Sequence, residues 1–298
     1  MLIGLAMLGG GFGAGVFGSL LGLGGGTLLV PLLTLGFGLP LRDAVGVSLV
    51  AVIVTSSASA SVFLQRHAAN LRLGMTLELF TAIGAIAGGV IAFAVDQRLL
   101  AGLFAVLLAY VALSMLIRGG AEVAPTGVAP GGVAPAEAAP AEAGRDAAHG
   151  EDADGAGEPR RGWAGEMIAR LSGRDYRIRR LGLGFVGSLG AGVVSALLGI
   201  GGGLIKVPVM HLAMGVPLRV ATATSNLMMG ITASASAVIY LLRGGIDPYV
   251  AGPTAIGVFL GASLGSRVVH RIDLRILRLL FTVVLLYTAF QMLRRAFG

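Results

Sequence analysis

Two stretches of the chain share one pattern: residues 22–31 read GLGGGTLLVP, and residues 199–208 read GIGGGLIKVP. In each, a run of three glycines interrupts an apolar stretch and leads to a proline. Glycine costs a helix interior about 1 kcal/mol relative to alanine, so three in succession favour unwound backbone. Inside a bilayer such backbone is tolerated only where protein buries it or where it lines a watery cavity.

The rest of the composition is typical of a membrane protein. Of the 298 residues, 55% are hydrophobic and 12% are charged, and the mean hydropathy is +0.87. A membrane crossing needs roughly 20 apolar residues. Uncharged stretches close to this length recur at about 44–63, 79–95, 99–117, 220–242, 249–266 and 279–293, and the apolar stretches 2–41 and 181–218 contain the glycine runs. The predicted fold class is therefore an all-α polytopic membrane protein.

Charge and cysteine content exclude several function classes. The chain has no cysteine, which excludes disulfides, thiolate nucleophiles and cysteine metal sites. Its net charge of +7 comes almost wholly from arginines at loops and segment ends. That distribution indicates membrane topology and not nucleic-acid binding.

The sequence repeats itself at an offset of 177 residues. Residues 13–118 align with 190–295 without a gap, and 41 of the 106 positions are identical. The matches include both glycine runs, Pro31 with Pro208, Ser48 with Ser225, and Thr55 with Thr232. The alignment predicts a first membrane repeat over residues 1–118 and a second over residues 181–298.

The segment between the repeats has a different composition. Residues 119–160 are rich in Ala, Pro, Gly and Glu and hold eight of the fifteen acidic residues, which predicts a disordered linker. Residues 161–180 are basic, with Trp163, Met167 and Leu171 at helical spacing. They form either an amphipathic helix on an anionic membrane face or a basic flank of the next crossing. Both interpretations place the linker in the cytoplasm.

The number of crossings per repeat depends on residues 2–41. This stretch crosses the membrane once, or twice as two short halves broken at the glycines, which gives four or five crossings per repeat. With five, the positive-inside rule is met somewhat better, because fewer arginines without a nearby aspartate face outward. An odd number also makes the two repeats inverted, the symmetry that many secondary transporters use for alternating access.

Each glycine run predicts a substrate contact. A short helix that begins just after the glycines directs its free N–H groups and its positive dipole end towards the cavity, where the partner should be an anion. Paired broken segments at matching positions of two repeats indicate a transporter's binding site. The predicted contacts are Gly24, Gly25, Gly26, Gly201, Gly202 and Gly203. The alternative is close helix packing, which is our interpretation of GAIAG at 84–88 and GASLG at 261–265.

These motifs resemble a known family. The doubled GLGGGTLLVP and GIGGGLIKVP, the stretch TSNLMMGITASASAVIY at 224–240 and the linker between the repeats are similar to the sulfite exporter TauE/SafE family, also called the 4-toluene sulfonate uptake permease family. The resemblance covers about residues 5–295. It implies a polytopic protein of the bacterial inner membrane that moves sulfite, sulfonates or other small organosulfur anions.

Lys206 is the only lysine in the chain and follows the second glycine run, where the first repeat has Leu29. A cation within a membrane segment is expensive and is by default a functional residue, so we expect it to face the anion. The alternative is a lysine whose head reaches the membrane interface. Small polar residues indicate a cavity lining beside the short helices, or only hydrogen bonds within their own helices. These are Ser48, Thr55, Ser225, Asn226 and Thr232.

Two titratable residues are candidates for proton coupling. Glu78 is the one acidic residue within reach of a membrane segment, although its position soon after Arg72 favours an interfacial carboxylate. His211 either carries a proton or only forms a hydrogen bond. No residue spacing predicts a metal site, a cofactor or a nucleophile with its base. We therefore expect a secondary transporter of small anions. A membrane-embedded enzyme or assembly partner is the alternative.

Overall fold

The computed structural model describes residues 2–20, 26–65, 69–117, 178–268 and 274–297. All the regular elements in these ranges are helices. In the first half they are α1 (Leu2–Leu20), α2 (Gly26–Pro31), the π-helical turn η1 (Leu32–Gly36), α3 (Leu41–Gln65), α4 (Leu71–Ala94) and α5 (Gln97–Ile117). In the second half they are α7 (Leu181–Leu198), α8 (Gly203–Pro208), the π-helical turn η2 (Val209–Ala213), α9 (Leu218–Leu242), α10 (Pro248–Val268) and α11 (Leu274–Phe297). The expected linker over 119–160, and the basic segment up to residue 177, lie outside the described residues.

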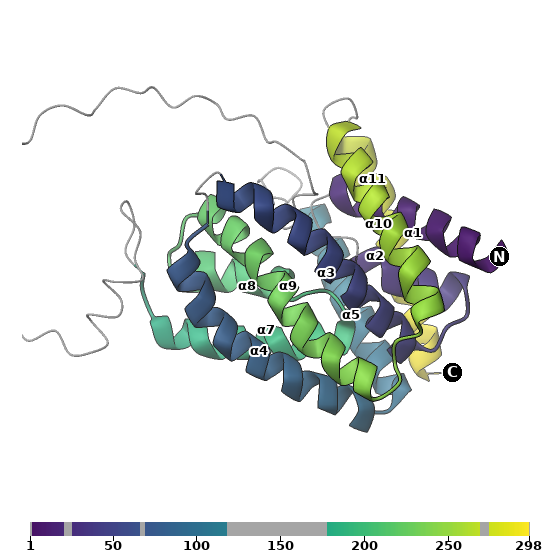
Figure 1. Cartoon of the computed structure of the whole chain (residues 1–298), viewed down its shortest axis with the longest axis horizontal. Coiled ribbons are helices and arrows are strands. Elements are labelled where there is room, and N and C mark those ends of the chain that lie inside the picture. The colour runs from purple at the N-terminus through teal and green to yellow at the C-terminus, as the bar shows by residue number, and fades with distance from the viewer. Residues whose placement is uncertain (1, 21–25, 66–68, 118–177, 269–273, 298) are drawn as a thin grey trace, which may run out of the picture.

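The two halves have matching element boundaries. At the offset of 177, the bounds of α2, η1 and α3 coincide with those of α8, η2 and α9. The helix partners also correspond. The helix α1 packs on α10 as α4 packs on α7, while α3 packs on α9 and α5 packs on α11. Figure 1 shows α3 beside α9 in the centre, with α4 and α7 on one side and α1 and α10 on the other.

The central helices α3 and α9 run antiparallel. Gly46, near the start of α3, contacts the carbonyl of Gly245, which follows the end of α9. At the opposite end, the backbone N–H of Asn70 donates to Thr224 Oγ1 at 3.0 Å, which brings the start of α4 to the start of α9. Corresponding helices of the two halves therefore point in opposite directions at the centre of the molecule.

Each short helix changes its winding at a proline. Pro31 and Pro208 end α2 and α8, and a π-helical turn follows each of them. A proline within a helix has no N–H to donate to the preceding turn, and its ring crowds that turn's carbonyl. The N–H of Leu39 then bonds the carbonyl of Leu33, and that of Val216 bonds the carbonyl of Met210, closing the two turns in the same way.

The outer helix faces are apolar. Four helices within the described ranges are long and apolar enough to cross a membrane: Leu71–Ala94, Gln97–Ser114, Leu181–Leu198 and Val220–Leu242. Shorter apolar helices cover Ile3–Gly18, Gly26–Gly36 and Gly203–Ala213. On α4, the exposed side chains include Met75, Leu79 and Ile83. Because these faces suit lipid and not water, the protein is embedded in a membrane.

Glycines bring the paired helices into backbone contact. A Cβ atom at Gly84 of α4 would lie 2.1 Å from the carbonyl oxygen of Leu189 on α7, and one at Gly261 of α10 would lie 2.0 Å from that of Phe12 on α1. Only glycine permits such an approach. The packing role expected of the glycines at 84–88 and at 261 is thus present in the structure.

Substitutions at two glycines of α7, two residues apart, would test this packing. A methyl group at Gly192 would lie 2.1 Å from the carbonyl oxygen of Thr81, whereas a methyl group at Gly190 would meet open space. We expect Gly192→Ala to lower the thermal unfolding temperature of the purified protein, since overpacking costs about 1–3 kcal/mol. Gly190→Ala, the matched control, should leave it unchanged or raise it, because alanine favours helix by about 1 kcal/mol. Equal effects of the two substitutions would contradict the backbone contact.

Candidate functional site

The second glycine run is unwound. Gly199, Gly201 and Gly202 have φ values of 68°, 78° and 77°, a left-handed conformation that side chains rarely adopt. The N–H of Gly199 bonds the Ser195 carbonyl at 2.8 Å and ends α7, and α8 begins four residues later at Gly203. Gly201, Gly202 and Gly203 are all buried. The run therefore forms a buried break between two helices.

Gly26, the last glycine of the first run, lies against the break at the second run inside the protein. A Cβ atom at Gly26, the first residue of α2, would lie 2.8 Å from the carbonyl oxygen of Gly199. Ser48 Oγ joins the runs because it lies 2.7 Å from the Gly199 oxygen and 3.4 Å from the Gly26 oxygen. The first predicted contacts, Gly24 and Gly25, lie outside the described residues.

Lys206 forms a buried ion pair with Glu78. Its Nζ lies 3.1 Å from Glu78 Oε2 and donates to Thr232 Oγ1 at 2.6 Å. The Thr232 hydroxyl in turn donates to Glu78 Oε1 at 2.6 Å. Lys206 is 1% exposed and Glu78 is 4% exposed. These three side chains come from α8, α4 and α9, so the pair ties three helices together in the interior.

This geometry bears on three expectations from the sequence. The Lys206 head is held in the protein interior by burial and by both of its hydrogen bonds, so it does not extend to the surface. The sequence predicts a fixed positive charge at Lys206 that faces an anion, and in the structure the ammonium group faces the carboxylate of Glu78. The Glu78 carboxylate is buried among Lys206 and Thr232, and its position relative to the membrane interface stays a prediction.

Several buried hydroxyl and amide donors of α7 and α9 have no partner. Ser195 Oγ, Ser225 Oγ and Asn226 Nδ2 are buried and form no hydrogen bond within the structure described. A Cβ atom at Gly202 would lie 3.3 Å from Ser195 Cβ and 3.5 Å from Lys206 Cε, and one at Gly203 would lie 3.6 Å from Ser225 Oγ. Buried polar groups without partners are unusual and costly in proteins. Here two of them flank the unwound glycines.

Other predicted residues have partners of their own. Thr55 Oγ1 bonds carbonyls of its own helix, at 3.0 Å to Ala51 and 3.2 Å to Val52. His211 Nδ1 lies 2.9 Å from the carbonyl oxygen of Val216, in the loop after η2. Within the described ranges, no cluster of three His, Cys, Asp or Glu side chains could hold a metal ion.

Sequence reasoning missed Ser195 and the pairing of Lys206 with Glu78. At the offset of 177 these two charged residues correspond to Leu29 and Ala255. A lysine and a glutamate that are both absent from the other repeat, both within apolar segments, are the signal that could have identified the pair. Ser195 corresponds to Gly18 and is likewise unmatched.

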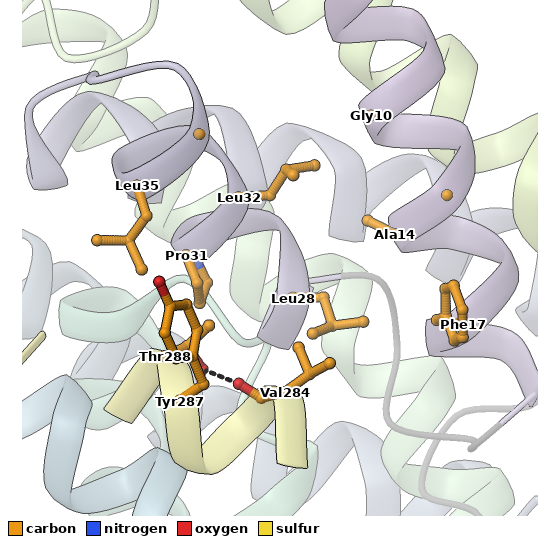
Figure 2. Close-up of a pocket in the computed structure, with 12 residues that line it drawn as sticks. Gly10, Ala14, Phe17, Leu28, Pro31, Leu32, Leu35, Val284, Tyr287 and Thr288 are labelled. Atoms are coloured by element: carbon orange, nitrogen blue, oxygen red, sulfur yellow. Dashed lines mark hydrogen bonds between the residues drawn. The ribbon is translucent and has the colours of Figure 1, made fainter. Parts of the chain in front are cut away.

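A cavity of about 460 Å³ lies elsewhere in the molecule, between α1, the α2–η1 segment and α11. Its lining is almost wholly apolar, including Phe17, Leu28 and Leu32 (Figure 2). The Thr288 hydroxyl at its edge donates to the Val284 carbonyl of its own helix at 2.9 Å. Since this cavity offers no charge and no free N–H donor among its lining side chains, it is not suited to an anion.

Comparisons with known proteins identify the family. The family model for the sulfite exporter TauE/SafE matches residues 7–292. A curated relative, the probable membrane transporter protein YunE of Bacillus subtilis (strain 168), is 22% identical over 290 residues, covering 94% of this chain and 93% of the relative. No solved structure matches the chain significantly. Because the family model spans nearly the whole sequence, the chain belongs to the sulfite exporter TauE/SafE family and is a membrane transporter.

Proposed function

We propose that this protein is a secondary transporter of small sulfur-containing anions, such as sulfite and sulfonates. The observation that carries the proposal is a buried cation, Lys206, that closely follows glycines lying beside two buried serines with unpartnered hydroxyls, Ser195 and Ser225. An oxyanion is an acceptor without donors, and it matches a site that holds a cation and free O–H groups.

The anion binds between the starts of the two short helices. The helices Gly26–Gly36 and Gly203–Ala213 both begin at the last glycine of a run, so each presents N–H groups that have no partner in a preceding turn. The contact between Gly26 and the Gly199 carbonyl supports a single shared site. We include Gly24, Gly25, Gly201, Gly202 and Gly203 in that site as backbone contacts.

Side chains of the two central helices complete the proposed site. The helix α9 contributes three of them, Ser225, Asn226 and Thr232. Thr232 accepts a hydrogen bond from Lys206. Ser48 and Thr55 of α3 occupy the positions that correspond to Ser225 and Thr232. In this proposal Ser48 secures the junction of the two glycine runs, and Ser225 donates to the anion.

Alternating access follows from two inverted repeats of about five membrane segments each. The antiparallel course of α3 and α9 and the corresponding helix partners of the two halves support this arrangement. Inverted halves around one shared site can open it to either side of the membrane in turn. The basic residues at 161–180 support a cytoplasmic linker, and the family resemblance supports the cell membrane as the location.

Uptake into proteoliposomes tests the function directly. Sulfite, thiosulfate, sulfoacetate and taurine are supplied to vesicles that hold the purified protein, and accumulation is compared with empty vesicles. Protein-dependent accumulation of at least one of these compounds is expected. Enzymatic conversion of a compound in detergent, without any accumulation in vesicles, would favour a membrane-embedded enzyme instead.

Ser225 and Ser48 make a matched pair of variants. Ser225 Oγ has no partner within the structure described, whereas Ser48 Oγ bonds two carbonyls. We expect Ser225→Ala to raise thermal stability, since it removes an unsatisfied buried group that costs about 1–3 kcal/mol. It should also weaken thiosulfate binding about tenfold or more, because a hydrogen bond to a charged group contributes about 1.5–3 kcal/mol.

Ser48→Ala should instead lower thermal stability, because it separates the two glycine runs. Thermal unfolding without anion and calorimetric titration with thiosulfate measure both quantities. If Ser225→Ala binds thiosulfate as tightly as the unchanged protein does, Ser225 does not belong to the site.

The topology can be tested with single cysteines, because the chain has none of its own. We expect Ala139→Cys in the linker to react with a membrane-impermeant maleimide only from the cytoplasmic side. Arg295→Cys near the C-terminus should react only from the outside. Labelling of both from one side would contradict the inverted arrangement.

A further inference from the structure

We propose that Glu78 takes the place of the substrate's negative charge on Lys206, and that a proton bound by Glu78 releases Lys206 to the anion. The anion and one proton are then carried together. This inference rests on the proposed anion transport and adds its coupling ion. In the structure Lys206 and Glu78 form an ion pair, with Nζ 3.1 Å from Oε2.

The ion pair occupies the groups that an anion would need. Lys206 Nζ has three N–H donors, of which one points to Glu78 Oε2 and one to Thr232 Oγ1. The second carboxylate oxygen of Glu78 accepts from Thr232. The carboxylate of Glu78 is itself a small oxyanion, so its contacts show which groups at this position recognise one.

The remaining donors of the site are not used by Glu78. Ser195 and Ser225 have no partner, although both are less than 2% exposed and flank the glycines ahead of Lys206. Glu78 approaches from α4 and engages only Lys206 and Thr232. A substrate anion that approached Lys206 from the glycine side would come near Ser195, because Gly202 lies close to both Ser195 Cβ and Lys206 Cε.

The architecture does not require the pair for packing. The corresponding positions in the other half are Leu29 and Ala255, which are both buried. A buried ion pair is also no more stabilising in general than well-packed apolar residues. The charges at 206 and 78 are therefore retained for the site's chemistry.

Charge balance dictates the role of the proton. An anion that contacted Lys206 beside an ionised Glu78 would place two negative charges on one cation in a low-dielectric interior. A proton from the aqueous phase neutralises Glu78, and the anion then forms the ion pair with Lys206. On the opposite side of the membrane the anion is released, Glu78 gives up its proton to that same side, and the carboxylate pairs with Lys206 again. For a monovalent anion the loaded site is neutral.

Other titratable groups on the surrounding elements do not contact the pair. Arg72 on α4 and Arg180 before α7 are exposed. His211 on η2 bonds the Val216 carbonyl, and Tyr240 on α9 donates to the Ala196 carbonyl at 2.9 Å. Within the structure described, Glu78 is thus the titratable group that contacts Lys206, and its protonation would remove the negative charge that pairs with the ammonium group.

The test measures anion affinity against pH for the purified full-length protein. Thiosulfate and methanesulfonate are the probes, because their own charge is constant over the range used, from about pH 5 to pH 8. If one proton binds with each anion, the affinity of the unchanged protein falls by up to tenfold for each unit of rising pH. Glu78→Gln should bind equally well at all pH values, at least as tightly as the unchanged protein at the acidic end. Asp96→Asn, the same chemical change at an exposed carboxylate, should keep the pH dependence.

A double variant separates this role from a purely structural one. Lys206→Leu/Glu78→Ala introduces the residues found at the corresponding positions of the first half. We expect it to fold with a thermal stability at least equal to that of the unchanged protein, and to bind neither probe. Recovery of anion binding in the double variant would show that the pair is only structural.

Two further outcomes are decisive. Anion binding whose pH dependence survives in Glu78→Gln, or is absent from the unchanged protein, would overturn the proton coupling and leave the proposed transport intact. Failure of the unchanged protein and of Glu78→Gln to bind either probe at any pH would overturn the proposed function itself, together with this inference.

Discussion

Backbone that leaves a helix inside a membrane must find its hydrogen bonds within the protein, and the second glycine run is subject to this constraint. Its left-handed glycines end α7 and start α8 in the interior, where lipid could not satisfy the released N–H and C=O groups. Ser48 of the other half supplies one of the needed donors, to the Gly199 carbonyl. The break therefore depends on the contact between α3 of the first half and the junction of α7 and α8 in the second.

The same break determines the position of the buried ion pair between Lys206 and Glu78. Because α8 begins at Gly203, Lys206 is the fourth residue of this short helix, and its side chain reaches across to α4 and α9. Burying an ammonium and a carboxylate there costs desolvation energy that their attraction offsets only partly. The unpartnered serine hydroxyls at the same place add to that cost. Several unfavourable features gathered at one position are typical of a functional site, where stability is given up for chemistry.

Much of the fold could be predicted from the sequence, because the bilayer and the internal repeat both impose strong patterns on it. Apolar length identified the helical segments, and the glycine runs predicted the short helices that begin at Gly26 and Gly203. The packing role of Gly84 and Gly88 followed from their spacing. The sequence could not show which side chain faces Lys206, since residues 78 and 206 are joined only by the packing of α4 against α7 and α9. Tertiary packing determines that Glu78 pairs with Lys206, and it also determines that the hydroxyls of Ser195 and Ser225 have no partner.

The central claim is that Lys206 and the second glycine run bind the substrate anion. Its most direct test is a crystal structure of the protein soaked with selenite, a heavier analogue of sulfite, with the selenium located by anomalous scattering. The account predicts a selenium peak whose oxygens lie about 3 Å from Lys206 Nζ and from backbone nitrogens near Gly203, with Glu78 displaced from the ammonium group. A selenite ion bound away from α8, with the Lys206–Glu78 pair intact, would contradict it.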